Sequence, residues 1–94
     1  MKKVSPTTHL AQQLGLSQSR GLEAVMKAQF ITAVQREVVR QELTHAELAE
    51  RTGLPRSAIT GILSGSLQKI TIDRVLRLVE AVGLEPTIKL RRAA

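Results

Sequence analysis

Apolar residues recur at spacings of three and four along most of the chain, which is the period of a helix with one buried face. The first such stretch runs from about Leu22 to Gln41 and predicts one long amphipathic helix. A second stretch runs from Thr71 to Val82 and predicts another helix, with Gly83 as its C-cap. The expected core positions in the first stretch are Val25, Ala28 or Gln29, Ile31, Val34 and Val38. Those in the second are Ile72, Val75, Leu76, Val79 and Val82.

Between these stretches, a first short helix is predicted to begin at Thr44. Thr44 followed by Glu47 fits a capping box, in which each side chain satisfies a backbone donor at the helix start. The inward face of this helix is expected to carry Ala46, Leu48 and Ala49. Gly53 follows the last turn, where a left-handed backbone would cost a residue with a Cβ about 1–2 kcal/mol. A sharp turn at Gly53 is therefore predicted.

A second short helix is predicted to follow this turn, because Pro55 suits a helix start, where its missing N–H is no loss. Its apolar stripe consists of Ile59, Ile62 and Leu63. The opposite face is small and polar and consists of Arg56, Ser57, Thr60, Gly61 and Ser64. Two short helices joined by a tight glycine turn have the shape of a DNA-reading helix-turn-helix, whose second helix reaches base edges in the major groove. The alternative is a surface helix with short polar residues and no partner.

The whole segment resembles the phage-repressor-like (Xre-type) helix-turn-helix family of bacterial regulators. It is most similar to the branch that includes HigA-like antitoxins. The likeness covers about residues 28 to 90 and rests on four stretches, namely 33–39 (AVQREVV), 43–49 (LTHAELA), 57–65 (SAITGILSG) and 72–84 (IDRVLRLVEAVGL).

This resemblance implies a set of DNA-contacting positions. His45 stands where the family usually has a Gln that contacts a phosphate. The base-facing or groove-facing positions are Arg56, Ser57, Thr60 and Gly61, while Ser64 and Lys69 lie close enough to touch backbone phosphates. Arg56 is the obvious base reader, through bidentate bonding to guanine.

Two residues depart from the family pattern within the predicted second helix. Pro55 stands where a capping Ser or Thr is common, and Gly61 where a longer reader is common. Gly61 costs up to about 1 kcal/mol relative to Ala inside a helix. We expect its small size to serve close approach to DNA or to a neighbouring helix.

Composition predicts one small all-α domain, a compact bundle of about five helices. A chain of 94 residues with 43% hydrophobic content can bury one core. The core must be aliphatic, since Phe30 is the one aromatic residue. Without cysteine, disulfides and thiolate metal sites are excluded. No apolar run approaches the roughly 18 residues of a membrane span, and no signal-peptide pattern is seen, so a cytoplasmic protein is expected.

The net charge of +6 resides at the two ends of the chain rather than in its middle. Residues 21–88 hold eight basic and eight acidic residues. Within this neutral body, residues 51–72 contain Arg51, Arg56 and Lys69 but no acid, which is where DNA would lie. The terminal Lys2, Lys3, Arg91 and Arg92 form either a solvated basic tail or further phosphate contacts.

Three regions are expected along the chain. Residues 1–21 form a flexible or partly helical N-terminal arm, residues 22–85 the helix-turn-helix DNA-binding domain, and residues 86–94 a C-terminal strand and basic tail. Pro86 to Leu90 alternates between apolar and polar residues, which is typical of a strand, and a single strand needs a partner.

We expect this strand to pair with its copy in a twofold homodimer, through Thr87, Ile88, Lys89 and Leu90. The alternative is that the tail folds against its own chain or is frayed. A dimer would set two recognition helices about 34 Å apart, so its operator would be an inverted repeat. HigA-like relatives form dimers, which the resemblance adds as support.

The sequence predicts no enzyme, no cofactor and no metal site. Its two near-neutral proton carriers, His9 and His45, lie in separate segments, and no phosphate-cradling loop is present. The leading function is a sequence-specific transcriptional regulator that binds double-stranded DNA. The resemblance extends this to an antitoxin that represses its own operon and partners a small ribonuclease toxin. The alternative is a protein-interaction module that keeps the scaffold but binds DNA weakly or without specificity.

Overall fold

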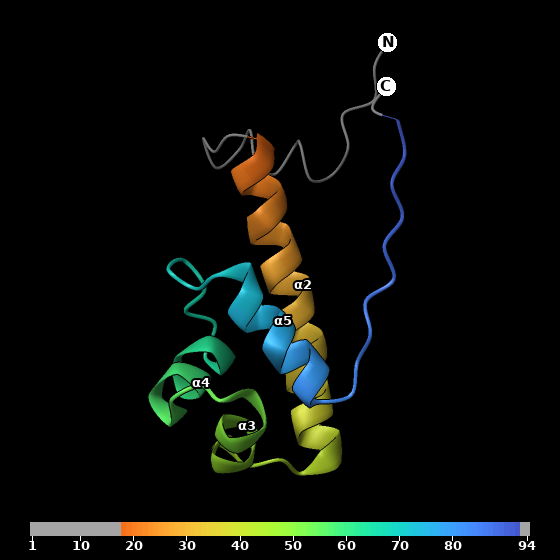
Figure 1. Cartoon of the computed structure of the whole chain (residues 1–94). Coiled ribbons are helices and arrows are strands. Elements are labelled where there is room, and N and C mark those ends of the chain that lie inside the picture. Colours follow the sequence, from red (N-terminus) through yellow and green to blue (C-terminus); the bar gives the residue numbers. More distant parts are fainter. Residues whose placement is uncertain (1–17, 93–94) are drawn as a thin grey trace.

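The periodic apolar segments form four helices in the part of the chain that the computed structural model describes, residues 18–92. These are α2 (Gln18–Gln41), α3 (His45–Thr52), α4 (Arg56–Leu63) and α5 (Ile72–Ala81). In Figure 1, α5 lies alongside the long α2, and α3 and α4 form a pair on one side of it. With 24 residues, α2 is about 36 Å long and extends past the other helices.

All four helices contribute to a single aliphatic core. The fully or nearly fully buried residues are Ile31, Val34, Leu48, Leu54, Ile59, Ile62, Val75, Leu78, Val79 and Val82. Phe30 is half-buried and packs against this cluster from its edge. The prediction of an aliphatic core is thus confirmed for the described residues.

The predicted starts of α3 and α5 are confirmed, although the start of α3 is not a complete capping box. The backbone N–H of Glu47 donates to the Thr44 hydroxyl at 3.1 Å, as expected. The Glu47 carboxylate, however, accepts from that same hydroxyl at 3.1 Å instead of from the Thr44 backbone. Thr71 caps α5 in a similar way, because its hydroxyl accepts from the backbone N–H of Arg74.

The helices end in left-handed residues, and at three of the four ends that residue is glycine. Gly53 is the C-cap of α3 with a φ of 74°, as the sequence predicted, whereas α5 has Val82 as its C-cap and the left-handed Gly83, with a φ of 83°, follows it. The end of α2 differs, since Glu42 adopts a φ of 55° there. The backbone N–H groups of Glu42 and Leu43 donate to the carbonyls of Val39 and Val38, which is a Schellman motif formed without glycine. Glu42 therefore carries the strain that glycine avoids at the other ends.

Four details of the predicted helices are wrong. Ala28 and Gln29, the two alternatives for one core position of α2, are both exposed. Ala46 is exposed, because the eight-residue α3 buries only the one side chain Leu48. Leu76 is 40% exposed, and Leu78, which periodicity did not single out, is fully buried. Positions 75, 78, 79 and 82 follow the i, i+3, i+4, i+7 pattern, which leaves Leu76 at the edge of the stripe. Finally, α2 begins at Gln18, before the predicted start at Leu22.

The expectation of about five helices with a C-terminal strand is also wrong. Residues 18–92 contain four helices and no strand. Leu84 still packs against the core, and beyond it the chain has no regular structure and runs back alongside the length of α2 (Figure 1), with Ile88 and Leu90 78% and 94% exposed. The alternation at 86–90 favours an extended backbone, but a strand also needs a neighbour with free N–H and C=O groups, and the helices have already paired theirs. Most of the predicted N-terminal arm, residues 1–17, lies outside the described residues.

Candidate nucleic-acid interface

The turn between α3 and α4 is held by hydrogen bonds that the sequence makes available locally. The backbone N–H of Gly53 donates to Ala49 O at 2.9 Å, which ends α3. The Thr52 hydroxyl donates to Leu48 O at 2.7 Å and accepts from the backbone N–H of Leu54 at 3.1 Å. Leu54 is buried, so the turn is anchored in the core. This turn sets the direction in which α4 leaves α3.

Pro55 precedes α4 with a ψ of 144°, and the helix then buries Ile59 and Ile62 completely. The predicted outward face lies opposite these two isoleucines. Its residues are exposed at Arg56, Ser57, Thr60 and Ser64 and half-buried at Gly61. The structure therefore brings these five predicted site residues together on one surface.

The polar groups on this surface fall into two sets. The hydroxyl of Ser64 donates to Gly61 O at 2.7 Å, and that of Thr60 lies 3.1 Å from Arg56 O, so both are directed back to the helix itself. Within residues 18–92, the side chains of Arg56 and Ser57 have no such partner. The first turn of α4 thus presents the side chains that are free to bond to a ligand.

His45 lies at the start of α3 and is half-buried against α4. Its Nδ1 is 2.8 Å from the Thr60 hydroxyl oxygen, so the two predicted site residues are joined by a hydrogen bond. The sequence placed His45 and Thr60 at separate contacts and gave no sign of this bond. Nε2 is the imidazole nitrogen left for a group outside the protein.

The loop after α4 carries the remaining predicted contact. Gly65 is left-handed, and the backbone N–H groups of Gly65 and Ser66 donate to Ile62 O and Gly61 O at 3.0 and 3.1 Å. Residues 65–69 then surround a shallow hollow of about 420 Å³. Lys69 lies at its edge and is exposed. The loop that follows α4 therefore carries an exposed cation.

Sequence reasoning missed the side chains that hold α4 and α5 to α2. Gln35 Nε2 donates to Leu63 O at 2.7 Å, at the last turn of α4. Gln41 Nε2 donates to Val82 O at 2.9 Å, directly after α5. Both are polar residues on a predicted amphipathic helix, where a solvated role is the ordinary expectation. Each bond joins residues far apart in sequence, so no local pattern signals it.

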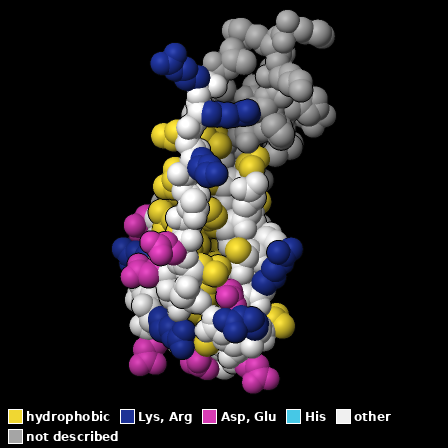
Figure 2. All heavy atoms as spheres, turned by 90° about the vertical axis from the view of Figure 1, so that its right-hand side faces the viewer, with side chains coloured by type: hydrophobic (Ala, Val, Ile, Leu, Met, Phe, Trp, Pro, Cys, Tyr) yellow, Lys and Arg dark blue, Asp and Glu magenta, His cyan; other side chains and the backbone are white. Residues whose placement is uncertain are grey.

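The four residues predicted for dimerisation lie away from this surface. Thr87, Ile88, Lys89 and Leu90 belong to the extended tail and are all exposed. The tail is on the far side of α2 from α4 in Figure 1. The face seen in Figure 2, turned away from α4, has acidic and basic side chains mixed over its lower half and hydrophobic side chains along its middle. This mixture contrasts with residues 51–72, which contain no acid.

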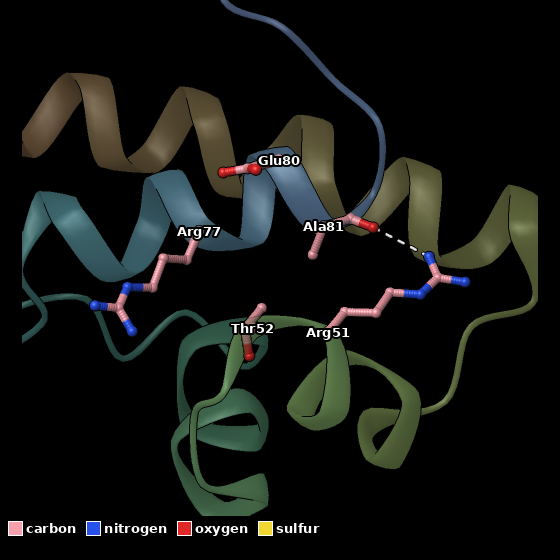
Figure 3. Close-up of a pocket in the computed structure, with 5 residues that line it drawn as sticks. All are labelled: Arg51, Thr52, Arg77, Glu80 and Ala81. Atoms are coloured by element: carbon pink, nitrogen blue, oxygen red, sulfur yellow. Dashed lines mark hydrogen bonds between the residues drawn. The ribbon is translucent and has the colours of Figure 1, made fainter.

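A second hollow of about 440 Å³ lies between α3 and α5 (Figure 3). Arg51 Nη1 donates to Ala81 O at 3.0 Å, and Arg77 points the opposite way and pairs with Asp73 at 3.1 Å. Glu80 is the one carboxylate that lines it. Because both guanidinium groups already have partners, this hollow offers little to a ligand.

One ion pair on α2 alters the pKa values of both of its partners. On the exposed surface of α2, Arg40 donates hydrogen bonds to Glu37, which lower the pKa of Glu37 and raise the pKa of Arg40. In residues 18–92, no three His, Cys, Asp or Glu side chains are grouped so that they could hold a metal ion. No described helix combines the length and apolar character that crossing a membrane requires.

Two short helices joined at a glycine turn, the second with an exposed polar face, define a helix-turn-helix protein. A family model described as "Helix-turn-helix domain" matches residues 10–91, and the chain belongs to that family. A search of curated proteins found no significant match. Membership in this family supports a DNA-binding regulator.

Proposed function

We propose that this protein is a sequence-specific transcriptional regulator that places α4 in the major groove of DNA. The observation that carries the proposal is the first turn of α4, where the side chains of Arg56 and Ser57 are exposed and make no hydrogen bond within residues 18–92. The opposite face of the same helix is buried in the core. The N-terminal residues of a recognition helix are those that contact base edges. Arg56 is the base reader, through two hydrogen bonds to a guanine.

Residues that can contact DNA phosphates lie on either side of the first turn of α4. The Ser64 hydroxyl lies at the C-terminal end of α4, Lys69 lies in the loop that follows, and His45 is hydrogen-bonded to Thr60 in the middle of α4. The absence of acid from residues 51–72 supports the same orientation, since a carboxylate there would repel the duplex. Such contacts release counterions, so binding should weaken steeply with salt.

We further propose that two copies bind an inverted repeat with recognition helices about 34 Å apart, one helical turn of DNA. The sequence motifs at 43–49 and 57–65 favour the HigA-like branch. On this hypothesis the protein is an antitoxin that represses its own operon and partners a small ribonuclease toxin. The identity of the adjacent gene and the mass of the purified complex test this extension.

The central test is a titration of the protein against a fragment of its own promoter at several salt concentrations. We expect a steep log–log dependence on salt from several phosphate contacts. Arg56→Ala should cost about 1–3 kcal/mol and relax the sequence preference. Arg40→Ala is the matched control, because it removes one positive charge from the surface of α2 and should leave the preference unchanged.

One observation favours a second function, a protein-interaction module on the same scaffold. Two of the three hydroxyl groups on the outward face of α4 hydrogen-bond to backbone carbonyls of the helix itself. Few polar side chains are therefore left to contact bases. If promoter fragments bind no better than random DNA and Arg56→Ala changes nothing, the interaction module replaces the regulator.

A further inference from the structure

The hydroxyl of Thr60 has two protein partners and one hydrogen. Its oxygen is 2.8 Å from His45 Nδ1 and 3.1 Å from Arg56 O. If the hydroxyl donates to Arg56 O, His45 must donate from Nδ1. If it donates to Nδ1 instead, the imidazole carries its hydrogen on Nε2. In both arrangements the hydrogen of the hydroxyl stays within the protein.

Thr60 is nevertheless exposed on the outward face of α4. With its oxygen directed toward His45 and the preceding turn, the group left without a partner is the γ-methyl. The following residue, Gly61, has no side chain, and a Cβ built there meets no atom within 4 Å. A ligand can therefore approach this methyl group closely.

In the major groove, the apolar group that a base presents is the 5-methyl of thymine. We propose that Thr60 is a specificity-determining residue that contacts a thymine methyl through its own methyl group, and that His45 is the positioning residue that holds the hydroxyl away from the bases. This inference rests on the proposed function, since it requires α4 to enter the major groove. It assigns to the operator a thymine within a few base pairs of the position read by Arg56, because the two residues lie one helical turn apart on α4.

The test uses a short duplex that the wild-type protein selects from a random-sequence pool. Each thymine is replaced in turn by deoxyuridine, which removes the 5-methyl alone. At one position, affinity should fall about three- to fivefold, the value of one buried methyl group. Thr60→Val keeps the methyl and should show the same loss at that position. Thr60→Ser keeps the hydroxyl without the methyl and should show none.

His45 is tested by restoring its hydrogen bond. His45→Ala should weaken the deoxyuridine effect, because the Thr60 side chain is then free to rotate, and His45→Gln should restore it. A nitrogen-resolved NMR spectrum of the His9→Gln variant, which has one imidazole, reports the bond without DNA. The Nδ1 signal should shift with Thr60→Val and stay in place with Ser64→Ala.

Several results would overturn the inference. If the selected duplex has no position where deoxyuridine lowers affinity, the methyl contact is refuted. The same holds if Thr60→Ser remains sensitive to deoxyuridine. Neither result contradicts the proposal that the protein is a sequence-specific regulator. An Nδ1 signal unmoved by Thr60→Val removes the role of His45. If the wild-type protein selects no sequence at all, the proposed function fails together with this inference.

Discussion

Replacing Gly61 by alanine adds one methyl group to α4, so its effects on protein stability and on DNA affinity can be compared directly. It lies inside α4 with a helical backbone, and a Cβ added there would meet no protein atom within 4 Å. The fold thus gives no reason for a glycine at this position, and the expected contact with a neighbouring helix is absent from the described residues. Glycine is about 0.8–1 kcal/mol less favourable than alanine inside a helix.

Gly61→Ala should therefore raise the free energy of unfolding by about 0.5–1 kcal/mol. For a domain of this size, that corresponds to an increase in Tm of roughly 2–8 °C, measured by circular dichroism. Gly65→Ala is the matched control, because Gly65 has a φ of 93° and its replacement should lower stability by about 1–2 kcal/mol.

The same variant should bind DNA less well, although it is more stable. If the duplex lies against the bare backbone at Gly61, an added methyl group overfills a close contact at a cost of about 1–3 kcal/mol, or roughly 5- to 150-fold in Kd. Fluorescence anisotropy with a promoter duplex measures this change, with Arg40→Ala on the surface of α2 as the control. A higher Tm with unchanged affinity would show that close approach is not why the glycine is present. A lower Tm would refute the structural argument itself.

Three further changes have defined outcomes. Glu42→Gly should raise stability by about 0.5–1 kcal/mol in thermal unfolding, because it relieves the left-handed strain at the end of α2 and loses part of that gain to chain entropy. Gln35→Ala should lower stability by about 0.5–1.5 kcal/mol by freeing the carbonyl at the end of α4, whereas Gln29→Ala on the same helix should not. The lowered pKa of Glu37 means that its pair with Arg40 stabilises the fold above the ordinary value of 4.5 and loses that effect as the pH falls. When denaturation is measured at pH values above and below 4.5, the free energy of unfolding should fall less on acidification for Glu37→Gln than for the wild-type protein.

Local rules predicted the helix-turn-helix unit well. Thr44, Gly53 and Pro55 each act through backbone groups within a few residues, so their roles could be inferred from the sequence. The buried pair Ile59 and Ile62 followed from helical periodicity in the same way.

What the sequence could not supply depends on contacts between distant segments. The amide of Gln35 and the imidazole of His45 act on α4 across 28 and 15 residues, and neither has a local signature. The strand expected at 86–90 is absent for a related reason. The alternation of apolar and polar residues describes one segment alone, whereas a strand forms only where a second segment pairs with it. Leu76 was assigned to the core because periodicity alone does not fix which edge of an apolar stripe faces the neighbouring helix.

The attachment of α4 has a thermodynamic consequence. Ile59 and Ile62 fix its rotation about its own axis, and the Gln35 amide fixes its last turn. A shift of one residue would rotate the helix by about 100° and turn its hydrophilic side inward. Any molecule that docks on α4 therefore meets a preformed surface. The heat capacity change of complex formation should then reflect only the desolvation of the contact area, without a contribution from coupled folding.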